Sequence, residues 1–364
     1  MSVAEHLRRR IRAEGPLPVA DVMAAALMHP EHGYYATRDP FGAAGDFVTA
    51  PEISQMFGEL VGLWAAVVWQ GMGTPDPVAL VELGPGRGTL MADALRAAAG
   101  VPEFRAALRV HLVEASPTLR RVQAERLVAA DPHWHDGLDG LPDLPAIVVA
   151  NEFFDALPIL QLVRDGRNWR ERRVALDATT GGFAWTLAPG ASPHAALLAP
   201  ELALGAPDGA LVELCPAGLA IARALADRVV RLGGAVLAID YGHAPSGIGE
   251  TLQAVKAHRS VGILDTLGDA DLTAHVDFAA LGRVVAEAGA VQHGPVGQGS
   301  FLRQLGIEAR RDALCRRATD DQRGVLQSGC ARLIDPAEMG TLFKVVAWTG
   351  SGTPPPPGFQ EPNA

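Results

Sequence analysis

The stretch "VALVELGPGRGTLMADAL", residues 78–95, decides the expected fold. Its apolar first half predicts a buried strand that ends near Glu82, and its second half has the spacing of an amphipathic helix. Three glycines, Gly84, Gly86 and Gly88, lie between them at alternate positions. Glycine lets the chain turn sharply and brings the backbone close to a ligand. The stretch therefore predicts a strand–turn–helix unit with a ligand site at the turn.

The chemistry of this turn points away from phosphate. It lacks the Gly-Lys-Ser/Thr ending of a P-loop, and its third glycine comes one place early for the dinucleotide fingerprint. Pro85 also removes a backbone N–H group that a pyrophosphate loop would use. A nucleoside without phosphates fits better, and S-adenosylmethionine, which joins adenosine to an amino acid, is the expected cofactor. We assign Glu82, Gly84, Pro85, Gly86 and Gly88 to its site, with Glu82 suited to its ammonium and sulfonium groups.

Strands and helices alternate through much of the remaining chain. Further strand patterns occupy residues 108–116, 146–158, 235–242 and 341–350, and helical patterns separate several of them. Repeated strand–helix units predict an α/β fold with a doubly wound, mostly parallel sheet and helices on both faces. Ligands of such sheets bind beyond the carboxyl ends of the strands, so the residues after each strand are the candidates for the site.

Three of these candidates belong to the cofactor side. Glu114 ends the second strand, where an acid can accept hydrogen bonds from both ribose hydroxyls. Trp134 and Asp136 follow a short third strand and would flank the adenine, with Asp136 accepting from its exocyclic amine.

The central strand leads into "NEFFDALP", residues 151–158, with Asn151, Glu152 and Asp155. Two carboxylates at one sheet edge can converge on a guanidinium, which is a poor nucleophile because its lone pairs are delocalised and its pKa exceeds about 12. They would bind its fork, localise its charge and accept its proton. The alternative is that Asp155 caps a helix starting at Ala156 and that Glu152 is an incidental surface acid.

The stretch "AAGDFVTAPEISQMFGE", residues 43–59, precedes the first strand and offers Asp46 and Thr49 as cofactor contacts. As a polar loop it would fold over the cofactor as a lid. The alternative makes Thr49 a helix cap and Glu52 its capping-box partner.

The 364 residues divide, as expected from the sequence, into three parts. Residues 1–75 form a helical N-terminal segment with the cofactor-covering loop. Residues 76–350 form the core, with insertions at about 160–210 and 245–300, the first of which shows the alternation of antiparallel hairpins. The Pro-rich tail, residues 351–364, is expected to be disordered.

Charge and residue spacing limit the partners. The net charge of −10 argues against a nucleic-acid binder, and no apolar run approaches the length of a membrane span. We expect no metal, because His29 and His32 lack partners at metal spacing. His275 and Asp277 would contact substrate or, as we prefer, cap the helix that follows.

Seven motifs occur in a fixed order: "GYY", "GDFVTAPEISQMFGE", "VELGPGRGTL", "NEFFDALP", "DYG", "DLTAHVDF" and "QGSFLRQLGI". Over residues 20 to 350 the chain resembles the MidA family, also called DUF185, of class I S-adenosylmethionine-dependent methyltransferases with a Rossmann-like fold. Gly84, Gly86, Gly88 and Glu114 match cofactor-binding positions of that fold. Glu152, beside Asn151, matches the substrate-facing position. One departure is Ala50, where the family has Ser.

The resemblance implies arginine methylation of a protein. The expected product is symmetric dimethylarginine on a core subunit of respiratory complex I, in aid of its assembly, and the expected compartment is the cytoplasm of a bacterium or the mitochondrial matrix of a eukaryote. A second copy of the chain, in a homodimer, is among the expected partners. Two alternatives stay open: a nicotinamide-dependent oxidoreductase that uses the same turn, and a non-catalytic assembly chaperone that retains the fold.

Overall fold

The computed structural model describes residues 2–37 and 49–360, which form two compact units of three chain segments each. Unit 1 comprises Met1–Phe47, Phe154–Ala220 and His243–Leu281. Unit 2 comprises Val48–Phe153, Ile221–Gly242 and Gly282–Ala364. The units divide the chain differently from the expected boundary at residue 75, because the long helix before the first sheet strand already belongs to unit 2.

Unit 2 is built on a sheet in the order β15-β16-β10-β5-β2-β3-β4. Its strands are β2 (Val78–Leu83), β3 (Leu108–Val113), β4 (His133–His135), β5 (Ala146–Asn151), β10 (Gly234–His243), β15 (Ala290–Gly297) and β16 (Phe343–Gly350). The five strands from β10 to β4 are parallel, whereas β16 runs antiparallel to both of its neighbours. The predicted doubly wound, mostly parallel sheet is confirmed.

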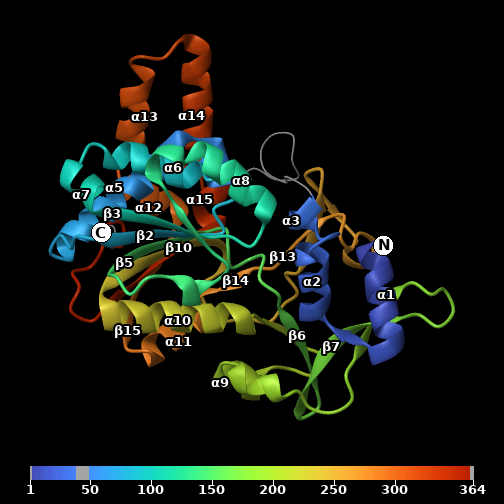
Figure 1. Cartoon of the computed structure of the whole chain (residues 1–364). Coiled ribbons are helices and arrows are strands. Elements are labelled where there is room, and N and C mark those ends of the chain that lie inside the picture. Colours follow the sequence, from blue (N-terminus) through green and yellow to red (C-terminus); the bar gives the residue numbers. More distant parts are fainter. Residues whose placement is uncertain (1, 38–48, 361–364) are drawn as a thin grey trace. The chain divides into compact units, whose positions relative to one another are not determined.

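Helices cover both faces of this sheet. In Figure 1, α5 (Gln55–Gly71) and α6 (Thr89–Ala98) lie on one side of the strands and α10 (Pro216–Leu232) on the other. Every residue of β2 and β5 is buried, which explains why these strands read as continuous apolar runs. Helices α5 and α6 approach closely at Gly62, where an added Cβ atom would lie 2.4 Å from the carbonyl oxygen of Ala94.

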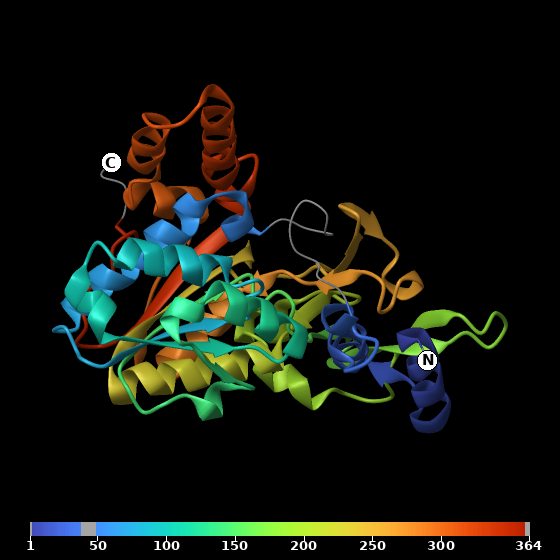
Figure 2. The same ribbon diagram turned by 45° about the horizontal axis from the view of Figure 1, so that its top comes forward.

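Further helices lie wholly or mostly in unit 2. They are α4 (Ala50–Ile53), α7 (Pro102–Ala107), α8 (Pro117–Arg126), α11 (Phe278–Glu287), α12 (Gln298–Gln304), α13 (Ile307–Cys315), α14 (Asp320–Ile334) and α15 (Met339–Leu342). Figure 2, like Figure 1, shows α13 and α14 as a helical hairpin that projects from the rest of this unit.

Unit 1 contains the antiparallel hairpins that the sequence predicts after residue 160. One sheet has the order β1-β7-β6-β9 with β8 on β7, and a second has the order β12-β11-β13. The strands are β1 (Leu17–Pro18), β6 (Leu160–Asp165), β7 (Asn168–Leu176), β8 (Phe183–Leu187), β9 (Leu211–Leu214), β11 (Gln253–Lys256), β12 (Arg259–Val261), β13 (Asp271–Thr273) and β14 (Val276–Asp277). The helices are α1 (Val3–Glu14), α2 (Val19–Met28), α3 (Tyr34–Thr37) and α9 (Pro200–Gly205).

Residues 351–360 of the Pro-rich tail belong to unit 2 and pack onto its helices, so the prediction of disorder is wrong there. The carbonyl oxygen of Pro357 accepts a hydrogen bond of 3.1 Å from the indole nitrogen of Trp64. The ring of Phe359 lies 5.5 Å from that of Phe301. Composition predicts disorder when a segment cannot bury apolar surface, but here a neighbouring aromatic surface provides the partner.

Candidate cofactor and substrate site

The glycine turn has the backbone that only glycine adopts readily. Gly84, Gly86 and Gly88 have φ angles of 59°, 53° and 74°. The N–H of Gly88 donates to the carbonyl oxygen of Pro85 over 2.7 Å, which closes the turn. A Cβ atom on Gly84 would lie 3.1 Å from the ring of Phe153. Of the turn between β2 and α6, Gly84 is exposed, whereas Pro85, Gly86 and Gly88 are buried.

Glu82 lies beneath this turn, at the end of β2, with 4% of its surface exposed. Burial raises the pKa of its carboxyl to about 8, and the nearby charge of Glu114 adds to the rise. A hydrogen bond from the backbone N–H of Met91 acts in the opposite direction and lowers this pKa. Among the described residues nothing hydrogen-bonds to Oε2 of Glu82. Glu82 thus supports the first turn of α6, and its contact with the cofactor stays a prediction.

Glu114 follows β3 and is nearly buried, as the expected ribose partner should be. Its Oε1 accepts from the backbone N–H of Ser116 at 2.7 Å, and its Oε2 accepts from Nε2 of Gln123 at 3.2 Å. Burial raises its pKa, and these two hydrogen bonds oppose that rise. Its carboxylate is held in one orientation beside the glycine turn, because Gln123 also bonds to the carbonyl oxygen of Gly86.

The two residues expected at the adenine lie in different environments. Trp134 is partly buried, and its indole N–H donates to Oε1 of Gln123 over 2.8 Å. The side chain of Asp136 is 94% exposed and pairs with Arg120 at 2.5 Å. An adenine contact from Asp136 stays a prediction.

Glu152 has a strained backbone and a fixed carboxylate. Its φ angle is 49°, which costs on the order of 1 kcal/mol for a residue with a Cβ atom. Its Oε1 accepts from the N–H of Ala50 at 2.9 Å and from the side-chain amide of Asn151 at 3.1 Å. Among the described residues the buried Oδ1 of Asn151 has no hydrogen-bond partner. Strain of this kind gathers at functional sites, which supports Glu152 over an incidental surface acid.

Asp155 is buried, but the cap proposed as its alternative role is wrong. Residues 152–159 form bends and turns, so no helix starts at Ala156. The carbonyl oxygen of Asp155 accepts from the N–H of Ala274 at 3.0 Å. Asp155 belongs to unit 1 and Glu152 to unit 2, so the convergence of their carboxylates stays a prediction.

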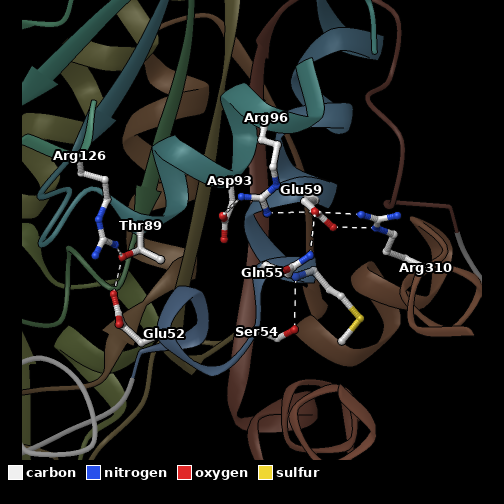
Figure 3. Close-up of polar contacts among 10 residues, drawn as sticks. Glu52, Ser54, Gln55, Glu59, Thr89, Asp93, Arg96, Arg126 and Arg310 are labelled. Carbon is white, nitrogen blue, oxygen red and sulfur yellow. Dashed lines mark hydrogen bonds and ion pairs between the residues drawn. The ribbon is translucent and has the colours of Figure 1, made fainter. Parts of the chain in front are cut away.

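The expected lid is described only from Thr49 onward, and Asp46 lies outside the described residues. Thr49 is the N-cap of α4, yet its side chain makes no capping hydrogen bond, so the predicted capping box is wrong. Glu52 instead accepts from the hydroxyl of Thr89 at 2.5 Å and lies 3.8 Å from Arg87. Figure 3 shows this link from α4 to the start of α6, with Arg126 on the other side of Thr89.

One buried acid beside Glu152 was not predicted. Asp240, in the "DYG" motif on β10, is fully buried and accepts from the backbone N–H of Phe153 at 3.2 Å and of Tyr241 at 2.9 Å. It thereby holds the residue after Glu152. The signal that could have found it is the acid in an otherwise apolar central strand.

The cap preferred for Asp277 is confirmed, since its Oδ1 accepts from the N–H of Ala280 at 2.8 Å in the first turn of α11. Asp277 and His275 also line a small cavity of unit 1, about 30 Å³ in volume, beside Cys215.

Within residues 2–37 and 49–360, no group of three or more His, Cys, Asp or Glu side chains is arranged to hold a metal ion. In the same ranges no helix has the length and apolarity needed to cross a membrane.

The residues of unit 2 fit S-adenosylmethionine. The turn from Gly84 to Gly88 would pass close to the amino-acid part, and Glu114 would hold the ribose. The buried Oε2 of Glu82 and Oδ1 of Asn151 have no hydrogen-bond partner among the described residues, so each has room in its hydrogen bonding for a donor from a bound ligand. Glu152 follows β5, the strand next to β2, and its contact with a substrate stays a prediction.

Comparison with known proteins agrees with this assignment. A family model for S-adenosyl-L-methionine-dependent methyltransferases matches residues 60–296. A mitochondrial protein arginine methyltransferase NDUFAF7 homolog of Drosophila melanogaster is 40% identical, with 95% of this chain and 84% of that protein covered. The mitochondrial protein arginine methyltransferase NDUFAF7 of Homo sapiens is 35% identical, with 94% of this chain and 82% of that protein covered.

A solved structure is similar over nearly the full length. It is a Burkholderia thailandensis protein crystallised with S-adenosyl-homocysteine, which has a TM-score of 0.81 and 30% sequence identity. The alignment covers 99% of this chain and 92% of that one.

Proposed function

This chain belongs to the family of S-adenosyl-L-methionine-dependent methyltransferases to which the MidA resemblance pointed, and we propose that it methylates an arginine side chain of a protein. The chain is thus an enzyme, and S-adenosyl-L-methionine is its cofactor. The proposal concerns the acceptor of the methyl group. The nicotinamide-dependent alternative has no further support, because the matching family model names S-adenosyl-L-methionine as the cofactor.

The acceptor chemistry requires a base. When bound, the cofactor supplies a methyl group on a positively charged sulfur, which leaves as a neutral thioether. A guanidinium must lose a proton as its nitrogen bonds to that methyl carbon, because otherwise the product would carry a second charge. The carboxylate of Glu152 would hydrogen-bond to the guanidinium N–H and accept this proton. In this transfer the guanidinium nitrogen would form a bond to the methyl carbon as the bond from that carbon to sulfur breaks. The Glu152 oxygen would form a bond to the proton as the bond from nitrogen to that proton breaks.

The observation that carries this proposal is the fixed orientation of Glu152. Donors from two different elements, Ala50 on α4 and Asn151 at the end of β5, bond to the same oxygen of its carboxylate. Its strained backbone is also tied to β10, because its N–H donates to the carbonyl oxygen of Ile239 over 2.8 Å. An acid positioned before the substrate arrives loses little entropy when it binds a guanidinium, which favours catalysis.

The names of the relatives support arginine as the acceptor, since the fly and human proteins are called protein arginine methyltransferases. On the MidA resemblance we further propose symmetric dimethylation and a core subunit of respiratory complex I as the substrate, whose assembly the modification would aid. The compartment would follow the source, the cytoplasm in a bacterium or the mitochondrial matrix in a eukaryote. A homodimer stays part of the proposal.

Substitution of Glu152 by Gln tests the proposed role. Glutamine keeps the size of the side chain but cannot accept the proton, so we expect methyl transfer to fall by roughly a hundredfold or more. Affinity for S-adenosyl-homocysteine, measured by isothermal titration, should stay within about twofold of the unsubstituted protein. The exposed acid Glu103 on α7 provides a matched control, and Glu103→Gln should change neither quantity.

An unchanged rate in Glu152→Gln would remove Glu152 from the mechanism. Absence of any methyl transfer by the unsubstituted protein, combined with normal cofactor binding, would instead favour the assembly-chaperone alternative.

A further inference from the structure

The side chain of Gln123, on α8, connects the separate parts of the cofactor site. It is fully buried. Its Nε2 donates to the carbonyl oxygen of Gly86 at 2.7 Å and to Oε2 of Glu114 at 3.2 Å. Its Oε1 accepts from the indole N–H of Trp134 at 2.8 Å. One amide therefore joins the glycine turn after β2, the acid after β3 and the aromatic residue on β4.

The chemistry of these neighbours permits only one orientation of the amide. A backbone carbonyl and a carboxylate accept hydrogen bonds, so the NH2 group must face Gly86 and Glu114. The indole N–H of Trp134 only donates, so the amide oxygen must face it. Both amide hydrogens and the oxygen are used, and a flipped amide would lose all three contacts.

We propose that Gln123 is a positioning residue for the cofactor, which holds the Gly86 carbonyl and the Glu114 carboxylate in the arrangement that binds S-adenosylmethionine. In a trans peptide the carbonyl and the following N–H point in opposite directions, so the bond to Gly86 turns the N–H of Arg87 away from α8. The bond to Glu114 leaves the other carboxylate oxygen with Ser116 and fixes the plane in which ribose hydroxyls must donate.

The packing of α8 beneath the turn supports this role. A Cβ atom on Gly88 would lie 3.3 Å from Leu127 and 3.6 Å from Cγ of Gln123, so the turn rests directly on this face of the helix. Without the amide, two buried acceptors would lose their donor, and the turn would lose its link to β3. The inference rests on the cofactor alone and not on the identity of the methyl acceptor.

The charge on Glu114 also depends on Gln123. Burial raises the pKa of Glu114, and the hydrogen bond from Gln123 opposes that rise, as do the N–H of Ser116 and the charge of Arg120 on α8. The carboxyl of Glu82, on β2, also interacts electrostatically with Glu114. Removing the amide should therefore move protonation of Glu114 to higher pH, and a protonated carboxyl is a weaker acceptor for ribose hydroxyls.

The test is the dissociation constant of S-adenosyl-homocysteine, measured by isothermal titration at pH 6, 7 and 8. We expect Gln123→Met to weaken binding about tenfold or more at pH 7, since buried acceptors lose a donor. The loss should grow as the pH falls. The matched control is Gln298→Met, because Gln298 on α12 is equally buried and bonds to the carbonyl oxygen of Leu333 at 2.9 Å. It should bind within about twofold of the unsubstituted protein.

A second variant covers the case in which Gln123→Met does not fold. Trp134→Phe keeps the aromatic ring but removes the donor that fixes the amide oxygen, and it should weaken binding severalfold. Affinity within twofold in the folded Gln123 variant, or in Trp134→Phe if that variant is needed, would overturn the proposal. An equal loss in Gln298→Met, or a loss that does not change with pH, would also overturn it, because either result would reduce Gln123 to a general stabiliser. No arginine substrate takes part, so failure here is separate from failure of the proposed methyl acceptor.

Discussion

At the residue scale, left-handed backbone conformations occur at the candidate site as well as at turns elsewhere in the chain, such as Thr74 and Asp131. Glu152 adopts a left-handed conformation although it has a Cβ atom, and the glycine turn adopts the same region three times. Both features lie at carboxyl ends of neighbouring parallel strands, β5 and β2. The sequence predicts the glycines as such, but it gives no sign that Glu152 is strained, since a single glutamate carries no conformational signal.

Gly88 provides a direct test of the turn. Alanine there would adopt a φ of 74° and place its Cβ atom 3.3 Å from Leu127, so we expect a loss of about 1–2 kcal/mol of stability. Binding of S-adenosyl-homocysteine should weaken about tenfold or more, because the turn must shift. Thermal unfolding and isothermal titration measure the two effects.

The control for this prediction is Gly137→Ala. Gly137 has an extended backbone, with a φ of −168°, and an added Cβ atom would meet nothing within 4 Å. If both variants bound the cofactor equally well, the turn would not need glycine for the reason given.

His111 should make the protein sensitive to acid. Burial, followed by the neighbouring His135 and His133, lowers its pKa from 6.5 to about 4. Because the folded pKa lies below the unfolded one, the neutral form is favoured by folding, and its stabilisation is complete above pH 6.5. It is lost as the pH falls from 6.5 towards 4, by about 3 kcal/mol.

Urea unfolding at pH 7, 6 and 5 measures this loss. In His111→Leu the slope of stability against pH should become shallower over this range, because one titrating group has been removed. A slope identical to that of the unsubstituted protein would assign the acid sensitivity to other groups.

At the scale of elements, one buried carboxylate joins three helices. Glu59 on α5 accepts from Nε and Nη2 of Arg310 on α13, at 2.7 and 2.9 Å, and from Arg96 on α6 at 3.0 Å. Figure 3 shows these contacts together with the pair of Arg96 and Asp93. Burial alone would raise the pKa of Glu59, but the two arginines outweigh it and the pKa is lowered. The base of the α13–α14 hairpin is thereby fixed to α5.

Removing one partner should reveal this coupling. We expect Arg310→Met to destabilise the protein by about 1–2 kcal/mol, less than for a fully buried pair, because the Arg310 side chain is 38% exposed. In the double variant with Glu59→Gln the loss should be about 1 kcal/mol smaller than the sum of the single losses. Additive losses in urea unfolding would show that the two side chains do not interact energetically.

At this scale, features that depend on nearby residues in the sequence could be predicted, whereas contacts between residues far apart in the sequence could not. Strands β2, β3, β5, β10 and β16 were predicted because apolar periodicity is local, and their carboxyl ends located Glu114 and Glu152. The role of Gln123 was not predicted, since its partners Gly86 and Glu114 lie 37 and 9 residues away and a helical glutamine looks unremarkable in sequence. The capping box at Glu52 failed for the same reason, because Thr89 competes for its carboxylate from 37 residues away.

At the scale of the whole molecule, two compact units interrupt one another along the chain. Two segments of unit 1, Phe154–Ala220 and His243–Leu281, are inserted into the sequence of unit 2. The first begins shortly after the end of β5, and the second begins at the end of β10. These strand ends are where ligands of an α/β sheet bind, so both insertions start beside the candidate site in the sequence. The sequence predicts insertions there, but it does not predict that the N-terminal segment joins them in one unit, because that requires contacts such as the pairing of β1 with β7.

The central claim is that this methyltransferase transfers its methyl group to arginine, and one measurement tests it most directly. The protein is incubated with S-adenosylmethionine labelled in the methyl group and with a lysate from cells that lack the protein, and the labelled band is hydrolysed to amino acids. We expect the label as methylated arginine, chiefly symmetric dimethylarginine, and about a hundredfold less of it with Glu152→Gln. Label in methylated lysine, or in a small molecule rather than a protein band, would contradict the account.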